Sequence, residues 1–348
     1  MKEFDINTLV RPNIAAMKPY TSARDEFKEV GADMVFLDAN ENPFENGVNR
    51  YPDPQQRDLK SLIARQHGRL NENILVGNGS DEVLDLIYRA FCRPGVDNVI
   101  TLPPTYGMYK VLAATNDIEN REVLLTDQFQ PNVAGIQAAV DAKTKIVFLC
   151  SPNNPTGNLI DKSAINELLE SFQGLVVIDE AYIDFCLEHS RVDGIEAFPN
   201  LIVTKTASKA YGMAGVRLGL AFASSDIITI LNKIKPPYNV NTLSLEKAYN
   251  RFANLGSVAL EVDAILDART RLMSALRVIP YVKQVYPSDA NFVLCRVDDA
   301  ERRYTQLIQK GIVVRNRSSQ PLCENTLRFT VGSTEEINTL IEALNIIA

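Results

Sequence analysis

The sequence predicts an α/β fold, in which helices cover both faces of a mostly parallel seven-stranded sheet and a smaller α+β domain follows. Two observations lead to this prediction. Between residues 73 and 224, short apolar runs rich in β-branched residues alternate with segments of helical periodicity. After residue 224 the pattern changes to long helical segments and then to further strands, which indicates a second domain.

The large domain is predicted from its apolar runs and the helical segments between them. The runs that we expect to form its strands occupy residues 73–77, 98–102, 121–125, 145–150, 174–179, 200–206 and 215–224. The helical segments, in which apolar residues recur on one face, occupy residues 81–92, 105–115, 132–140 and 162–172. Strands that are joined through helices run parallel with right-handed crossovers, so we expect a doubly wound layer structure.

The smaller domain is predicted from the C-terminal third of the chain. A long helical pattern precedes three strand patterns and a final helix, at residues 244–277, 291–297, 311–315, 326–331 and 334–346. The proline-rich segment KPPYN is a plausible joint between the domains. We therefore expect the large domain at residues 30–240, and the small domain at residues 1–29 together with 241–348.

Composition and charge exclude several classes of protein. The 348-residue chain carries a net charge of -7 without a basic cluster, so nucleic acid is not an expected partner. Five scattered cysteines and the lack of a membrane-length apolar run favour a cytoplasmic protein without a membrane partner. Because His67 and His189 are the only histidines and lie far apart, we expect neither a metal site nor a Ser-His-Asp triad.

Polar residues follow the first and fourth predicted strands, and ligands bind at the carboxyl ends of strands in an open α/β sheet. Gly79 follows the first strand and precedes a helix that starts near Ser80 and Asp81. The free N–H groups of such a helix start suit a phosphate, although either side chain could instead be a simple helix cap. Asn153 and Asn154 follow the fourth strand, where proline residues stiffen the loop and could hold an amide towards a ligand; a plain turn is the alternative.

The fifth and sixth strands are followed by the strongest candidates for chemistry. Asp179 ends an apolar strand, where a carboxylate needs a cationic partner such as a protonated ring nitrogen, unless it caps a helix or forms a local salt bridge. Lys209 lies among small residues, and a poorly solvated amine has a lowered pKa and can act as nucleophile and base. Arg217, with Thr206 and Ser208, could hold an anion beside that amine.

Two arginines belong to the strands of the smaller domain. Arg315 ends one predicted strand and Arg328 lies within another. Arginines fixed in this way suit bidentate binding of a carboxylate or a phosphate, although exposed arginines are also common on edge strands.

The motifs SPNNPTG, DEAY and SKAYGMAGVRLG, in this order and spacing, resemble those of the fold-type I aminotransferases that use pyridoxal 5'-phosphate (PLP). The segments LDANENPF, NRYPDP, GNGSDE, PPTYGMY, KPPYNVN and LRFTVGS extend the resemblance over nearly the whole chain to the class II family of histidinol-phosphate aminotransferases. The resemblance implies a fold-type I PLP transferase. It also implies amino transfer between L-histidinol phosphate and 2-oxoglutarate, which gives imidazole acetol phosphate and L-glutamate in histidine biosynthesis.

The same resemblance implies the cofactor contacts. Lys209 would bind PLP covalently, Asp179 would pair with the pyridinium nitrogen, and Tyr106 would stack on the ring. Asn154 and Tyr182 would hydrogen-bond the phenolic oxygen, which makes Lys209, Asp179 and Tyr182 the expected catalytic residues. The expected phosphate ligands are Ser80, Asp81, Thr206, Ser208, Arg217 and, across the interface of a homodimer, Tyr51.

For the substrate, the resemblance implies that Arg328 binds the carboxylate of glutamate and that Arg315 and Tyr20 bind the phosphate of the second substrate. Asn239 is a weaker candidate, and Asn154 would contact substrate as well as cofactor. An aromatic amino acid aminotransferase and a PLP-dependent decarboxylase of an amino acid phosphate in cobalamin synthesis remain alternatives. A non-catalytic PLP-binding regulator is more distant, because such proteins carry a DNA-binding helix-turn-helix before the fold.

Overall fold

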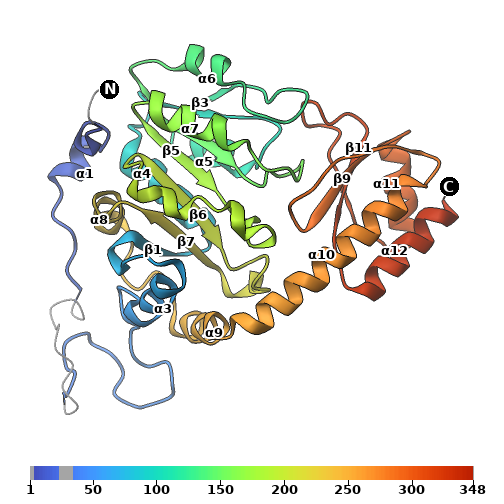
Figure 1. Ribbon diagram of the computed structural model, residues 1–348. Helices are drawn as coiled ribbons and strands as arrows, with labels where there is room; N and C mark the ends of the chain where they lie inside the picture. The colour runs from blue at the N-terminus through green and yellow to red at the C-terminus, as the bar shows by residue number, and fades with distance from the viewer. Residues whose placement is uncertain (1–3, 23–33, 348) are drawn as a thin grey trace.

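The computed structural model describes residues 4–22 and 34–347, which form a large and a small domain (Figure 1). The large domain contains a seven-stranded sheet with the order β1-β7-β6-β5-β4-β2-β3. Its strands are β1 (Ile74–Asn78), β2 (Asn98–Thr101), β3 (Glu119–Glu122), β4 (Thr144–Cys150), β5 (Leu175–Asp179), β6 (Leu201–Thr206) and β7 (Leu218–Ala223). Only β7 is antiparallel to its neighbours, so the predicted mostly parallel sheet is confirmed.

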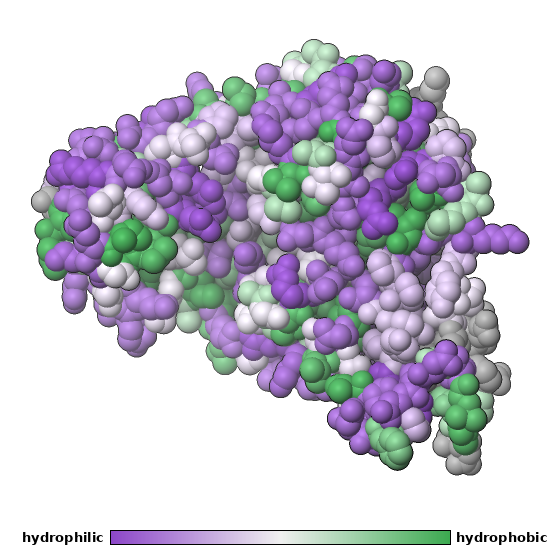
Figure 2. All heavy atoms as spheres, turned by 180° about the vertical axis from the view of Figure 1, so that it is seen from behind, coloured by the Kyte–Doolittle hydropathy of each residue, from purple (hydrophilic) through white to green (hydrophobic). Residues whose placement is uncertain are grey.

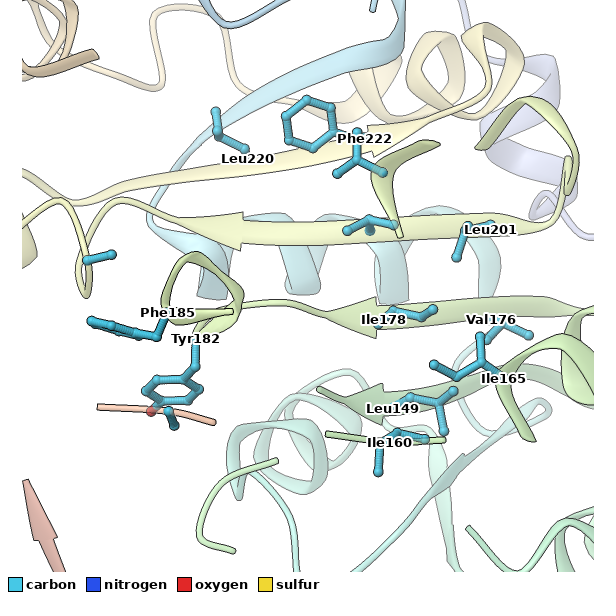
Figure 3. Packing of buried hydrophobic residues seen from close by; sticks show 14 of the residues in the cluster. Leu149, Ile160, Ile165, Val176, Ile178, Tyr182, Phe185, Leu201, Leu220 and Phe222 are labelled. Carbon is cyan, nitrogen blue, oxygen red and sulfur yellow. The ribbon is translucent and has the colours of Figure 1, made fainter. Parts of the chain in front are cut away.

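Helices cover both faces of this sheet. One face packs against α4 (Ser80–Phe91), α5 (Met108–Thr115) and α8 (Ser225–Ile234), and the other against α3 (Arg57–His67), α6 (Val133–Ala139) and α7 (Lys162–Ser171). Alternate strand residues point to opposite faces: Val176 and Ile178 join one core cluster, and Leu175 and Val177 join the other. Figure 3 shows the first of these clusters, with Ile165 of α7 close to Val176. Burial on both faces explains why these strands are continuous apolar runs.

The small domain contains a separate four-stranded antiparallel sheet with the order β10-β11-β9-β8. The helix α9 (Thr242–Ala253) packs into the core of the large domain through Ala248 and Phe252. The elements after it are α10 (Leu255–Arg277), β8 (Val282–Val285), β9 (Phe292–Val297), α11 (Ala300–Gln309), β10 (Arg315–Asn316), β11 (Thr326–Thr330) and α12 (Thr334–Ile346). The long helix α10 runs from the large domain towards this sheet (Figure 1). In the part of the chain that the structure describes, no helix is both long and apolar enough to span a membrane.

Four features differ from the sequence-based prediction. The helical pattern at 244–277 is two helices, because the side chain of Asn254 accepts a hydrogen bond from Ser257 N and starts α10. The edge strand β3 lies two residues earlier than expected and is polar, since it has only one neighbouring strand. The predicted strand at 311–315 is reduced to the short β10, and β8 carries no apolar pattern strong enough to predict it.

The N-terminal segment packs against the large domain. Ile6, Leu9 and Ile14, which flank and belong to α1 (Pro12–Ala16), join the core cluster of α4 and α8, and Arg11 N donates to the carbonyl of Ala90 over 3.0 Å. This packing differs from the expected grouping of residues 1–29 with the small domain, because apolar side chains here cover the α4 side of the sheet. The expected boundary at residue 30 lies outside the described residues, and the one at residue 240 stays a prediction.

Candidate active site

The carboxyl ends of β4, β5 and β6 meet at one edge of the large sheet. Cys150 at the end of β4 is paired with Asp179 at the end of β5, and Asp179 is paired with Thr204 of β6. The antiparallel β7 starts at this edge, so Arg217 directly before it lies near the end of β6. The candidate residues predicted from separate strands are therefore brought together, because parallel strands expose the same end of each strand.

Asp179 is a buried acid without an ion-pair partner among the described residues. The residue is only 2% exposed. The Tyr109 hydroxyl donates a 2.8 Å hydrogen bond to Oδ2, and Ala181 N donates to Oδ1 over 3.2 Å. Burial raises the pKa of the Asp179 carboxyl to about 6, although these hydrogen bonds act in the opposite direction. A cationic N–H group beside Oδ1 or Oδ2 would remove this electrostatic cost.

Lys209 follows β6 and remains accessible to solvent, as an amine that combines with a ligand must be. Its Nζ lies 5.7 Å from the centroid of the Tyr182 ring. Partial burial lowers the pKa of the Lys209 amine and the positive charge of Arg328 lowers it further, while Asp179 raises it. These surroundings favour the neutral, nucleophilic form of the amine.

The start of α4 forms a cradle for an anion. Its N-cap residue Gly79 has φ 84° and no side chain caps the first turn, so N–H groups near Ser80 are available to a ligand. A Cβ atom on Gly79 would lie 2.5 Å from Nη2 of Arg217, and one on Gly219 would lie 2.3 Å from Ser80 N. Both glycines are required for Arg217 and β7 to approach the helix start this closely.

Two hydroxyl groups lie at this cradle, and the carboxylate of Asp81 contacts its arginine. Thr206 Oγ1 donates to Ser208 Oγ over 3.0 Å, at the end of β6. Nη2 of Arg217 lies 3.6 Å from Oδ2 of Asp81, and Tyr106 donates a 3.0 Å hydrogen bond to Oδ1 of the same carboxylate. The structure thus brings together all five predicted phosphate ligands of the large sheet edge and places Tyr106 beside them.

Asn154 connects the two domains at the site. Its Nδ2 donates to the Tyr182 hydroxyl over 3.4 Å, and its Oδ1 accepts a hydrogen bond from Nη1 of Arg328 on β11. Nε of Arg328 is buried without a partner, and burial lowers the pKa of this guanidinium to about 10, with a further contribution from Arg317. Arg328 is therefore a poorly solvated cation that faces the large domain.

Four predicted residues lie away from this group or at its margin. Tyr20 is 73% exposed, and Tyr51 stacks on Tyr238 at a centroid distance of 4.5 Å. Arg315 is exposed and lies opposite Arg328 in the register of β10 and β11. The Asn239 amide donates to Val76 O and Glu82 Oε2 and accepts from Lys235 Nζ, so it is occupied in holding β1 and α4 together.

Sequence reasoning missed two residues of the site. Tyr109 holds Asp179 and could have been found from its position three residues after Tyr106, whose ring it contacts at a centroid distance of 5.5 Å. Arg317 lies close enough to Arg328 to lower its pKa, and it could have been found from its position two residues after Arg315, on the same face of a strand. Tyr109 ends the motif PPTYGMY, whereas Arg317 belongs to none of the motifs that pointed to the site.

The chemistry of these groups fits PLP. The cradle at Ser80 and Arg217 suits a phosphate, the unpaired Asp179 carboxylate suits a protonated ring nitrogen, and the Asn154 amide with the Tyr182 hydroxyl suits a phenolic oxygen. Lys209 supplies the amine for an aldehyde. Among the described residues, no group of three or more His, Cys, Asp or Glu side chains could hold a metal ion.

The chain is similar to proteins of a known family. Residues 29–344 match the family model described as aminotransferase class I and II. A histidinol-phosphate aminotransferase of Flavobacterium johnsoniae is 56% identical over 348 residues, which cover 100% of both chains.

Two solved structures share the fold. The histidinol-phosphate aminotransferase of Clostridium acetobutylicum aligns with a TM-score of 0.80 and 24% identity, over 86% of this chain and 91% of that chain. The enzyme of that name from Sinorhizobium meliloti, in complex with pyridoxal-5'-phosphate, aligns with a TM-score of 0.76 and 23% identity, over 86% and 83%. The predicted fold-type I architecture is thereby confirmed.

Proposed function

The chain belongs to the class I and II aminotransferase family, and from this membership we propose that it exchanges an amino group between L-histidinol phosphate and 2-oxoglutarate. The products are imidazole acetol phosphate and L-glutamate, as in histidine biosynthesis. The observation that carries the choice of substrate is the 56% identity, over the full length of both chains, to a histidinol-phosphate aminotransferase. PLP is the cofactor of this family.

The cofactor supplies an aldehyde that combines reversibly with amines and, through its protonated ring, withdraws electrons from the Cα–H bond of the bound substrate. Lys209 Nζ is the group that takes the proton from substrate Cα, because its pKa is lowered and it lies next to Tyr182. Asp179 would hold its negative charge beside the protonated ring nitrogen and so favour the cationic form of the ring. Tyr109 and Ala181 hold the Asp179 carboxylate in one orientation.

The arginines of the small domain bind the anionic group of each substrate. Arg328 is held by Asn154 at the entrance between the domains, where its guanidinium suits a carboxylate. Arg315 is its neighbour across the strand pair and carries a second positive charge, and Tyr20 adds a hydroxyl group. Binding of the substrate anion at these residues orients Cα towards Lys209.

We also propose that two copies of the chain form the active enzyme, with Tyr51 of each copy reaching the phosphate of the other. The extended segment near Tyr51 exposes large apolar side chains, since Leu37 is 89% and Phe44 is 79% exposed. Hydrophobic groups gather along this segment at the lower right of Figure 2. A cavity of about 520 Å³, lined in part by Tyr51 and Tyr249, lies beside it and offers a place for a partner's side chains. Light scattering at micromolar concentration should give the mass of a dimer, and a monomer would contradict this proposal.

A location in the cytoplasm is consistent with this biosynthetic role. All five cysteines of the chain are free and buried, as in proteins of a reducing compartment.

One assay separates the proposed reaction from its alternatives. Purified protein with PLP is incubated with glutamate and imidazole acetol phosphate, and 2-oxoglutarate is measured. We expect one 2-oxoglutarate per histidinol phosphate formed. Release of CO₂ from threonine phosphate would favour the decarboxylase, and faster transfer to aromatic oxo acids would favour an aromatic aminotransferase. PLP binding without amino exchange would favour a regulator.

A further inference from the structure

Three arginines lie on one face of the small sheet, at the side that meets the large domain. Arg315 of β10 and Arg328 of β11 are direct partners in the strand register, so their side chains leave the sheet on the same face. Arg317 follows Arg315 by two residues, and its N–H group donates to Thr326 O over 2.9 Å, which extends the strand pairing. The alternation of strand side chains therefore places Arg317 on this face as well.

The charges of these arginines are not neutralised within the chain. In the part of the chain that the structure describes, no acidic side chain forms an ion pair with Arg315, Arg317 or Arg328. Nε of Arg317 and Nε of Arg328 are both buried without a hydrogen-bond partner. Burial lowers the pKa of the Arg317 guanidinium, and Arg315 lowers it further. Partly buried cations that repel one another are costly, so this arrangement favours an anion from outside the chain.

The arginine face adjoins the active site. Arg328 donates to Asn154, which in turn donates to the hydroxyl of Tyr182. The segment Ser319–Pro321, just after Arg317, lines a cavity of about 340 Å³ whose other wall contains Tyr106 and Tyr109. Arg317 is thus close to the small-domain wall of a cavity that lies between the two domains, where it could contact one end of a bound ligand.

We propose that Arg317 is a third substrate-binding residue, which acts with Arg315 and Arg328 on the phosphate group and so makes the site prefer a phosphate dianion to a carboxylate. The inference rests on the proposed function, since it assigns a residue to the phosphate of histidinol phosphate. A dianion gains about twice as much from an added cation as a monoanion does at the same distance. Arg317 therefore favours histidinol phosphate over glutamate, although both substrates use the same lysine.

The test compares the two half-reactions in Arg317→Gln. Each half-reaction is followed by the change in cofactor absorption. Because hydrogen bonds to charged groups are strong, kcat/KM for histidinol phosphate should fall about 10- to 100-fold, while kcat/KM for glutamate should fall less than about 3-fold. Arg317→Lys, which keeps the charge, should recover part of the loss.

Arg296→Gln is the matched control. Arg296 pairs with Thr326 on the neighbouring strand of the same sheet, but its guanidinium faces Leu322 O and Glu324. The Arg296→Gln substitution should leave kcat/KM of both half-reactions unchanged. An unchanged melting temperature of each variant would confirm that its fold is intact. Equal losses in the two half-reactions of Arg317→Gln, or no loss in either, would overturn the inference.

A second measurement does not depend on the identity of the substrate. Inorganic phosphate should inhibit the glutamate half-reaction by competition, and its inhibition constant should rise at least 10-fold in Arg317→Gln. An unchanged constant would overturn the assignment of Arg317 to a phosphate. If the unmodified enzyme failed to convert histidinol phosphate, the proposed function would be wrong, while phosphate competition would still decide whether Arg317 binds such a group.

Discussion

The hydroxyl of Tyr109 donates a 2.8 Å hydrogen bond to Oδ2 of Asp179 and so connects α5 to the end of β5. Both residues are buried, and no cation of the described chain forms an ion pair with the carboxylate. Burial raises the pKa of Asp179 to about 6, whereas the hydrogen bond from Tyr109 lowers it. The ionised form of Asp179 is therefore stabilised by neighbouring hydrogen-bond donors, of which the Tyr109 hydroxyl is the first, until a cationic ligand binds.

Asp179→Asn should stabilise the protein without cofactor at high pH. In the unfolded chain the carboxyl ionises near pH 4, and in the folded chain near pH 6. Below pH 4 both states are protonated and the substitution has no electrostatic effect. Above pH 6 the folded state carries a buried charge, so removal of that charge should raise the free energy of unfolding by about 1–3 kcal/mol. Urea unfolding between pH 4.5 and 8 measures the difference.

The control for that experiment is Asp267→Asn, because Asp267 is exposed on α10. It should show no gain between pH 6 and 8. A gain in Asp179→Asn that is equally large at pH 4.5 and at pH 8 would show that the buried charge is not its cause. With PLP bound, the same Asp179→Asn protein should lose most of its turnover, since the ring nitrogen loses its anionic partner.

Tyr109→Phe should have the opposite effect on stability. The substitution leaves Oδ2 of Asp179 without its donor, so the carboxylate becomes more costly to bury. The free energy of unfolding should fall by about 1–3 kcal/mol at pH 8, and the loss should shrink below pH 6 as Asp179 becomes protonated. Tyr88→Phe is the matched control, because the Tyr88 hydroxyl is equally buried but donates to the Tyr109 carbonyl over 2.9 Å. Its effect should not vary with pH in this range.

Lys209→Ala should abolish covalent attachment of PLP and turnover together. Borohydride reduction of the loaded protein, followed by peptide mapping, should label the peptide that contains Lys209 and no other. Lys110→Ala removes an exposed amine that pairs with Glu122, and it should keep both label and activity. Labelled peptide from another lysine, or residual turnover in Lys209→Ala, would refute the assignment.

Gly219→Ala should weaken the binding of PLP indirectly, without contact between residue 219 and the cofactor. The added Cβ would lie 2.3 Å from backbone atoms of Gly79 and Ser80, so the start of α4 must shift. Such overpacking costs about 1–3 kcal/mol. The Kd of PLP should rise more than about 10-fold, measured by titration of the cofactor-free protein. Gly215→Ala is the control, because no atom lies within 4 Å of its added Cβ, and its Kd should not change.

Much of the fold and part of the site could be predicted from local sequence. The strands ending at Cys150 and Asp179 contain continuous apolar runs because both faces of the sheet are buried. The contact between Tyr109 and Asp179 could not be predicted from local sequence. It joins residues that are 70 positions apart and depends on how α5 packs. The bounds of the short β10 could not be predicted either, since its two residues are placed by pairing with β11 rather than by their own apolar pattern.

The two sheets carry different groups of site residues, and this affects how the substrate preference of such an enzyme can change. Asp179 ends β5 and Lys209 follows β6 of the large sheet, whereas Arg315, Arg317 and Arg328 belong to one hairpin of the small sheet. Substitutions in that hairpin can therefore change which anionic substrate is preferred. Lys209 and Asp179, which act on the reacting bonds, can stay the same. An engineer who wants a new acceptor should graft residues 315–328 and leave the rest of the protein as it is.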